Sequence, residues 1–295
     1  MGHNHNHTHD NFGKAFAIGI GLNTVYITLE AFYGFATNSS ALLADAGHNT
    51  SDVFGLVLAW AAIWIAKKKP SGKYTYGLRK TTILVSLLNS LLIILASGFI
   101  LWDAIEKIQN PIAVPSSTIM IVASIGLFIN AGTALMFMKG QHDLNIKGAF
   151  LHMAADAGVT LAVLIGGLVM KYTDAFWVDP CLSFLIVGVI LYGTWGLLVD
   201  SVKLVIDAVP KNIDVNEVED YLKTIEDVED VHDLHVWALS TTETALTAHL
   251  VIPKGYEDQL LYDVRDKLHQ TFNITHTTLQ VEKEWGNNKY CSCFH

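Results

Sequence analysis

The sequence predicts an α-helical membrane protein with six transmembrane helices followed by a small cytoplasmic α+β domain. Of its 295 residues, 51% are hydrophobic and 16% are charged, and the mean hydropathy is +0.36. This composition is more apolar and less charged than that of an average soluble protein. Six stretches also reach the length of about 20 apolar residues that a helix needs to cross a bilayer.

Short polar connectors separate the six predicted spans. The spans cover residues 15–37, 41–66, 81–102, 117–138, 148–170 and 181–202. The first is too long for the apolar core of a cleaved signal peptide, and no A-x-A-like cleavage site precedes the second span. We therefore expect the first span to stay in the membrane.

Basic residues predict the orientation of these spans. Residues 67–80, after the second span, contain six Lys and Arg, whereas the connectors on the opposite side contain only Lys107 and Lys171. Because Lys and Arg are enriched in cytoplasmic loops, residues 67–80 are expected in the cytoplasm. With six spans, both termini are then cytoplasmic too.

The composition changes after Pro210. Residues 209–295 hold 16 Asp and Glu against 7 Lys and Arg, a balance equal to the net charge of −9 of the whole chain. Apolar periodicity predicts helices at 215–225 and 257–272 and strands at 228–239, 244–252 and 276–284. We expect an acidic domain with its helices on one face of a short sheet, which attracts cations and does not bind nucleic acid.

The second and fifth spans each contain a His-x-x-x-Asp pair. These are His48 with Asp52 in "LLADAGHNTSD" and His152 with Asp156 in "LHMAADAG". Residues four apart share one helix face, and ionisable groups inside a span usually mark a pathway for ions or substrates. Two imidazoles and two carboxylates form a donor set that can close around Zn²⁺. One pair alone could be an intrahelical hydrogen bond, but the recurrence favours a metal site.

Asp45, one turn from His48, has three possible roles. It could orient His48 as an acceptor, line the exit path, or cap the start of the helix. We do not assign it as a ligand.

Five motifs spread along the sequence resemble those of a known family. "LLADAGHNTSD", "TYGLRK", "NIKGAFLHMAADAG", "LLVDSVKLVIDAVP" and "VEDVHDLHVWALS" are together similar to the cation diffusion facilitators, in the branch that exports zinc, cobalt and cadmium. The resemblance covers essentially the whole chain. It implies a homodimer in the bacterial inner membrane, with a ferredoxin-like cytoplasmic domain in each protomer. It also implies that a divalent metal leaves the cytoplasm in exchange for protons by alternating access.

The resemblance assigns the transport ligands to His48, Asp52, His152 and Asp156. Histidine at the first position favours zinc and cadmium over harder ions, because imidazole suits softer metals. Lys80 and Asp207 match positions that form a charge interlock at the dimer hinge in relatives, although Lys80 could simply follow the positive-inside rule. Residues 67–80 contain no His, Asp, Glu or Cys, so no metal is expected there.

The cytoplasmic domain offers a second set of zinc ligands. His232 and His249 match the sheet positions of a binuclear site in the family, Glu282 is a further candidate, and Gln280 is a doubtful one. The terminal "CSC" adds Cys291 and Cys293, similar to a Cys pair in some vertebrate zinc transporters, and clustered cytoplasmic thiols suit zinc better than a disulfide.

Several other residues receive weaker assignments. His235 should point to the opposite sheet face from His232, since side chains alternate along a strand. Cys181 is expected to pack in the sixth span. The tail "HNHNHTHD", with His3, His5, His7 and His9, predicts a metal-collecting segment. We expect three regions: a His-rich tail at 1–13, a membrane domain at 14–208 and a metal-binding domain at 209–295.

Two other functions also place metal ligands in a membrane protein. An intramembrane metalloprotease needs an open coordination position and usually an H-E-x-x-H motif, which this sequence lacks. A membrane-tethered metal sensor would use the acidic tail but has no need of paired ligands inside the bilayer. The sequence thus favours a transporter, not an enzyme, whose main cargo is Zn²⁺ or alternatively Cd²⁺ or Co²⁺.

Overall fold

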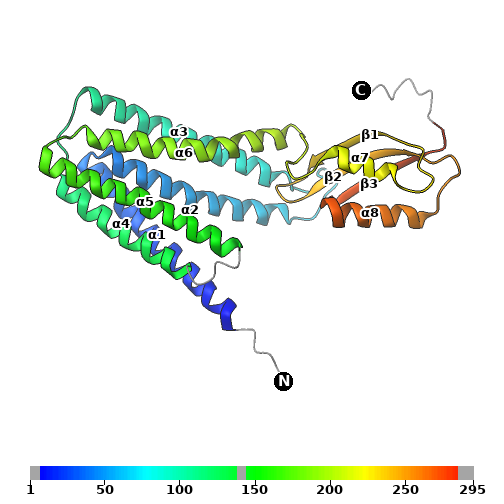
Figure 1. Cartoon of the computed structure of the whole chain (residues 1–295), viewed down its shortest axis with the longest axis horizontal. Coiled ribbons are helices and arrows are strands. Elements are labelled where there is room, and N and C mark those ends of the chain that lie inside the picture. Colours follow the sequence, from blue (N-terminus) through cyan, green and yellow to red (C-terminus); the bar gives the residue numbers. More distant parts are fainter. Residues whose placement is uncertain (1–6, 138–143, 285–295) are drawn as a thin grey trace. The chain divides into compact units, whose positions relative to one another are not determined.

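The structure is a computed structural model that describes the backbone at residues 7–137 and 144–284, and side chains at 21–135 and 150–284 (Figure 1). Six long helices come first: α1 (His7–Thr37), α2 (Ser40–Ala66), α3 (Thr81–Gln109), α4 (Ser116–Phe137), α5 (Leu144–Thr173) and α6 (Val178–Val205). The small domain follows as α7 (Val215–Lys223), β1 (Asp230–Ala238), β2 (Thr244–Val251), α8 (Asp258–Phe272) and β3 (His276–Glu282). The predicted fold class is therefore confirmed.

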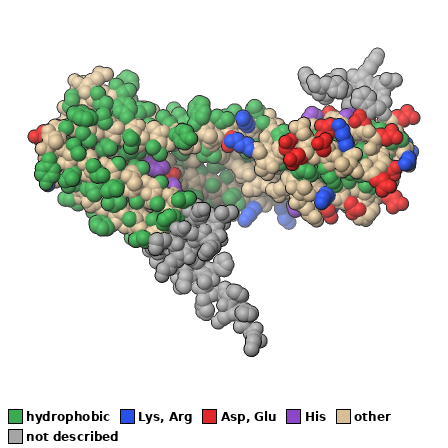
Figure 2. Space-filling model, in the orientation of Figure 1, with side chains coloured by type: hydrophobic (Ala, Val, Ile, Leu, Met, Phe, Trp, Pro, Cys, Tyr) green, Lys and Arg blue, Asp and Glu red, His purple; other side chains and the backbone are tan. Residues whose placement is uncertain are grey.

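Helices α2 to α6 are each long and apolar enough over their described residues to cross a membrane. Part of the predicted first span lies outside the residues with described side chains. Several helices run past the predicted spans; α3, for example, continues to Gln109. Hydrophobic side chains cover the surface of the helices, whereas Asp and Glu gather on the small domain (Figure 2).

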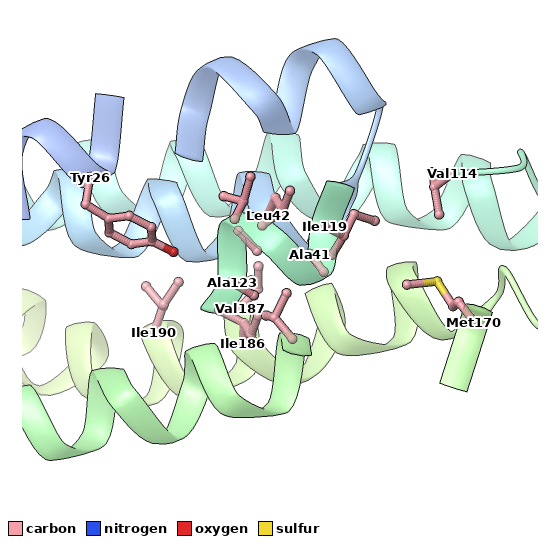
Figure 3. Packing of buried hydrophobic residues seen from close by; sticks show 13 residues of the cluster. Tyr26, Ala41, Leu42, Val114, Ile119, Ala123, Met170, Ile186, Val187 and Ile190 are labelled. Atoms are coloured by element: carbon pink, nitrogen blue, oxygen red, sulfur yellow. The ribbon is translucent and has the colours of Figure 1, made fainter. Parts of the chain in front are cut away.

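The chain divides into two compact units. The first runs up to Val57 and resumes over Asn89–Gly196, and the second comprises Leu58–Leu88 and the chain from Leu197 onward. In the core of the first unit, Ile119 and Ala123 of α4 lie near Ile186 and Val187 of α6 (Figure 3). These small and branched side chains bring α2, α4 and α6 into a common apolar core.

Polar groups fix the start of α2. The buried Asp179 carboxylate accepts hydrogen bonds from Ser39 Oγ at 2.5 Å and from the Ser40 backbone N–H at 2.6 Å. The first N–H groups of a helix have no partner within it, so Asp179 of α6 caps α2 from a neighbouring helix. Cys181, by contrast, is exposed on α6, so its predicted packing role is wrong.

In the second unit, the sheet has the order β1-β2-β3, with β1 and β2 antiparallel and β2 and β3 parallel. One face contributes Val236, Leu246, Ala248, Leu250 and Leu279 to a core with α7 and α8. The other face carries the alternate residues of β2, Thr247 and His249. The alternation predicted from the sequence thus divides the sheet into an apolar face and a polar face.

The connector between α2 and α3 contacts the small domain within this same unit. Arg79 Nη1 lies 3.1 Å from Glu243 Oε2, and the Thr241 backbone N–H donates to Thr82 Oγ1 at 3.1 Å. The start of α3 is therefore attached to the turn between β1 and β2.

Candidate metal-transport site

The two His-x-x-x-Asp pairs face each other across α2 and α5. His48 Nε2 lies 3.4 Å from Asp156 Oδ1, and His152 Nε2 lies 3.4 Å from Asp52 Oδ2. Each contact joins the histidine of one helix to the aspartate of the other. From His48 to Asp52 the chain runs toward the C-terminus of α2, while the facing residues on α5 run back from Asp156 to His152. The two helices are therefore antiparallel at this site.

One ligand atom from each of His48, Asp52 and Asp156 lies within 4.8 Å of the others, so these three residues fit a metal ion. His152 joins them through its contact with Asp52. The rings of His48 and His152 lie farther apart, with centroids 6.4 Å from each other. Four ligand atoms held about 2.0–2.2 Å from Zn²⁺ lie about 3.3–3.6 Å from one another. Both cross-helix distances of 3.4 Å fall in this range. Within the described part of the chain, the buried atoms Asp52 Oδ2 and Asp156 Oδ1 accept no well-aligned hydrogen bond, which leaves them available to a cation.

Solvent exposure differs along the site. The side chains of His152 and Asp52 are 45% and 34% exposed, whereas that of Asp156 is 2% exposed. The open end therefore lies toward the N-terminus of α5 and the C-terminus of α2. An ion entering at His152 and Asp52 would find the far end of the site closed.

Asp45 lies in the second turn of α2, which begins at Ser40, so the capping role considered for it is wrong. Its carboxylate is fully buried and accepts hydrogen bonds from Asn49 Nδ2 at 3.3 Å and Thr160 Oγ1 at 3.1 Å. Asn49 Nδ2 also lies 3.5 Å from Glu30 Oε2 of α1. Asp45 thus belongs to a buried polar network beyond the closed end of the transport site.

A second cluster of ligand atoms lies on the polar face of the small sheet. His249 Nδ1 is 3.0 Å from Glu282 Oε1, and His232 Nε2 is 3.5 Å from Glu282 Oε2. His232 pairs directly with His249 across β1 and β2, and β3 brings Glu282 alongside. One ligand atom from each of these three residues lies within 4.8 Å of the others, so the donor set fits a metal ion.

A β-bulge brings two further residues to this cluster. His232 pairs with His249 and His235 pairs with Thr247, so β1 holds one extra residue between them. The bulge places His235 on the same face as His232, and the expectation of opposite faces is therefore wrong. Asp233, in the left-handed region with φ 51°, lies 3.0 Å from His235 Nε2 through one oxygen and 3.5 Å from His249 Nε2 through the other.

Some predicted ligands lie outside the described residues. They are Cys291 and Cys293 at the C-terminus and the histidines of the N-terminal tail before α1. The side chains of His7 and His9 within α1 are likewise not described.

Comparison with known sequences identifies the family. Residues 16–206 match the family described as "Cation efflux transmembrane domain", and residues 210–284 match "Cation efflux protein, cytoplasmic domain". The chain belongs to the cation efflux family. The resemblance read from the motifs is thereby confirmed, including its zinc, cobalt and cadmium branch.

Similar members of the cation efflux family match along most of their length. The "Cadmium, cobalt and zinc/H(+)-K(+) antiporter" of Bacillus subtilis is 32% identical over 98% of this chain and 94% of its own. "Metal cation efflux system protein CzcD" of Cupriavidus metallidurans is 34% identical over 91% and 86%. "Zinc transporter ZitB" of Shigella flexneri is 31% identical over 92% and 88%.

One solved structure, the metal-bound C-terminal domain of a CzcD transporter, matches with a sequence identity of 35% and a TM-score of 0.21. The match covers 24% of this chain and 99% of the chain in that structure.

Within this cation efflux protein, sequence reasoning missed Thr160 and Asp233. Thr160 is a neutral residue inside an apolar helix, and threonine there usually bonds its own helix backbone. Asp233 stands in "HDLH", where a regular strand would turn it away from His249. The signal that could have found it was the crowding of polar residues in that strand, which is typical of a bulge.

Proposed function

We propose that this chain exports divalent metal cations, with Zn²⁺ as the main cargo, in exchange for protons. The observation that carries the proposal is the pair of cross-helix His–Asp contacts, whose atom spacing matches that of two ligands on one zinc ion. The names of the zinc, cadmium and cobalt transporters similar to this chain support it further.

Protons and metal compete for the same atoms in this site. A histidine must be neutral to bind a metal, so binding displaces any proton on the coordinating nitrogen. Without metal, protonated His48 and His152 can each pair with the carboxylates that face them. Protons that enter from the more acidic side of the membrane can therefore replace the metal. The protonated histidines then balance the negative charge of the two carboxylates.

Entry from the cytoplasm is supported by the exposure of the site. The basic connector 67–80 follows α2, and the exposed ligands Asp52 and His152 lie toward that end of α2. In the proposed topology, the protein lies in the inner membrane of a bacterium, with residues 67–80 and both termini in the cytoplasm. The open end of the site then faces the cytoplasm. The buried Asp156 then lies nearer the exit.

We further propose that the chain acts as a homodimer and that its cytoplasmic domain binds Zn²⁺. His232, His249 and Glu282 would hold the ion, and Cys291 with Cys293 would complete the site. Both ring nitrogens of His249 face carboxylates, so Asp233 can orient the ring while Glu282 shares the metal.

Uptake into sealed vesicles tests the proposal. The purified protein is reconstituted with a zinc indicator inside, and Zn²⁺ is added outside with and without an acid interior. We expect uptake that accelerates with the acid interior and is lost in Asp156→Asn, which removes one of the two neutralising charges. Uptake by Asp156→Asn at the parental rate would contradict the site, and repeating the assay with Cd²⁺ and Co²⁺ ranks the alternative cargoes. Binding of metal without any uptake would instead favour a membrane-tethered sensor.

A further inference from the structure

Helices α2 and α5 share a third cross-helix contact beyond the two that involve the transport ligands. Asp45 Oδ2 accepts a hydrogen bond from Thr160 Oγ1 at 3.1 Å. Asp45 and Thr160 are both fully buried. The contact lies one helical turn beyond His48 and Asp156, at the closed end of the site.

The three contacts form a regular series. Asp52 faces His152, His48 faces Asp156, and Asp45 faces Thr160. Along α2 the three contact residues are separated by four and then three positions, and along α5 by four positions each time. Residues at these separations share one face of a helix, so the same face of α2 meets the same face of α5 at all three contacts. The third contact contains no metal ligand, so it has no need to open when an ion binds between the other two.

The Thr160 hydroxyl is held at the centre of this contact. It accepts a hydrogen bond from Asn130 Nδ2 of α4 at 3.3 Å, and it lies 2.9 Å from the Asp156 backbone carbonyl. A hydroxyl has one hydrogen to donate. That hydrogen can point to the Asp156 carbonyl at 2.9 Å or to Asp45 Oδ2 at 3.1 Å. Donation to Asp45 links α5 to α2, whereas donation to Asp156 stays within α5.

Asp45 is in turn held from its own helix and from α1. Asn49 donates to Asp45 and approaches Glu30, and Glu30 accepts a hydrogen bond from the Tyr26 hydroxyl at 2.5 Å. Gly126 of α4 makes room for this tyrosine, since a Cβ there would overlap its hydroxyl. The link between Asp45 and Thr160 thus stands on a buried framework that involves α1, α2, α4 and α5.

We propose that Asp45 and Thr160 are positioning residues that set the distance between the two ligand pairs and thereby the metal affinity and selectivity of transport. The inference rests on the proposed transport function. A fixed spacing near 3.4 Å suits the four short bonds of zinc, whereas Mn²⁺ prefers six oxygen ligands. Loosening the link should weaken zinc binding and reduce the discrimination against Mn²⁺.

Replacing the hydroxyl at constant size tests this inference. Thr160→Val keeps the shape of the side chain and removes the donor, whereas Thr160→Ser keeps the donor. In vesicle uptake, we expect Thr160→Val to raise the KM for Zn²⁺ by about tenfold, the fold-change that corresponds to loss of one buried hydrogen bond. The maximal rate should change much less, the zinc-to-manganese preference should fall, and Thr160→Ser should restore both properties.

A purely structural role predicts a different pattern. It would lower the yield of folded protein and the maximal rate, with KM and the zinc-to-manganese preference unchanged, and that result would overturn the inference. If Thr160→Val is not recovered folded, Thr160→Ala is measured by the same criteria. Asp156→Asn is assayed in parallel. If Asp156→Asn loses uptake while Thr160→Val keeps the parental KM, only this inference is rejected. If Asp156→Asn takes up zinc at the parental rate, the site and the inference are rejected together.

Discussion

Lys80 Nζ lies 2.6 Å from Asp207 Oδ1. This ion pair connects the residue before α3 to the chain just after α6. Asp207 adopts a left-handed backbone with φ 60°, which aspartate tolerates better than most residues. The pair predicted from the family resemblance thus exists within one protomer, although its role at a dimer hinge stays a prediction.

The pair can be tested by exchanging its charges. Both side chains are about half exposed, and exposed ion pairs contribute only about 0.2–1 kcal/mol to stability. We therefore expect Lys80→Glu and Asp207→Lys to change the melting temperature little. If the pair acts as an interlock, each single change slows vesicle uptake and the double change restores it. Additive losses in the double variant would show that the two residues act independently.

A change of donor type tests His48. His48→Asp converts the transport site from two nitrogens and two oxygens to one nitrogen and three oxygens. Carboxylate oxygens suit harder ions, so the variant should admit Mn²⁺ more readily relative to Zn²⁺. Competition between the two metals in vesicle uptake measures this ratio, and an unchanged ratio would argue against His48 as a ligand.

The spans and the two His–Asp pairs could be predicted because each depends on periodicity. Apolar runs mark helices in a bilayer, and His-x-x-x-Asp fixes which side chains share a face whatever the partner helix does. The ends of helices were less predictable. In α3, Asp103 and Lys107 pair at 2.7 Å and continue the helix beyond its apolar run, where hydropathy gives no signal.

Contacts that depend on tertiary structure were not predictable. The side of the sheet that His235 faces depends on a bulge whose position no local pattern fixes. The partnership of Thr160 with Asp45 depends on the register of α5 against α2, since 115 residues separate the two side chains. Sequence spacing predicts partners within one element, and the two His–Asp pairs could be recognised because each lies within a single helix.

The capping of α2 by Asp179 predicts a stability effect separate from metal binding. Asp179→Ala leaves the Ser39 hydroxyl and the Ser40 N–H without their buried acceptor, which should lower stability by about 2 kcal/mol. The melting temperature in detergent should fall by several degrees, and Asp179→Asn, which keeps one oxygen acceptor, should lose less. Equal melting temperatures for the parent and Asp179→Ala would show that water replaces the cap.

Zinc bound by the cytoplasmic domain can be counted apart from zinc in the transport site. In an Asp156→Asn background, where the transport site is disabled, Glu282→Gln should lower the number of zinc ions bound per protomer, because Glu282 contacts both His232 and His249. Glu284→Gln is the matched control, since Glu284 is exposed and lies just beyond β3. Elemental analysis of the purified full-length chain gives the count.

The same preparation tests the terminal cysteines. A thiol that coordinates zinc is deprotonated and engaged, so zinc should slow alkylation of Cys291 and Cys293. Replacing both with serine should reduce the zinc count in the Asp156→Asn background. In a chain that keeps the parental Asp156, the same double change should slow uptake without abolishing it, because the proposed transport ligands are unchanged. If zinc leaves the alkylation rate unchanged and the count survives the double change, the domain site consists of His232, His249 and Glu282 without the thiols.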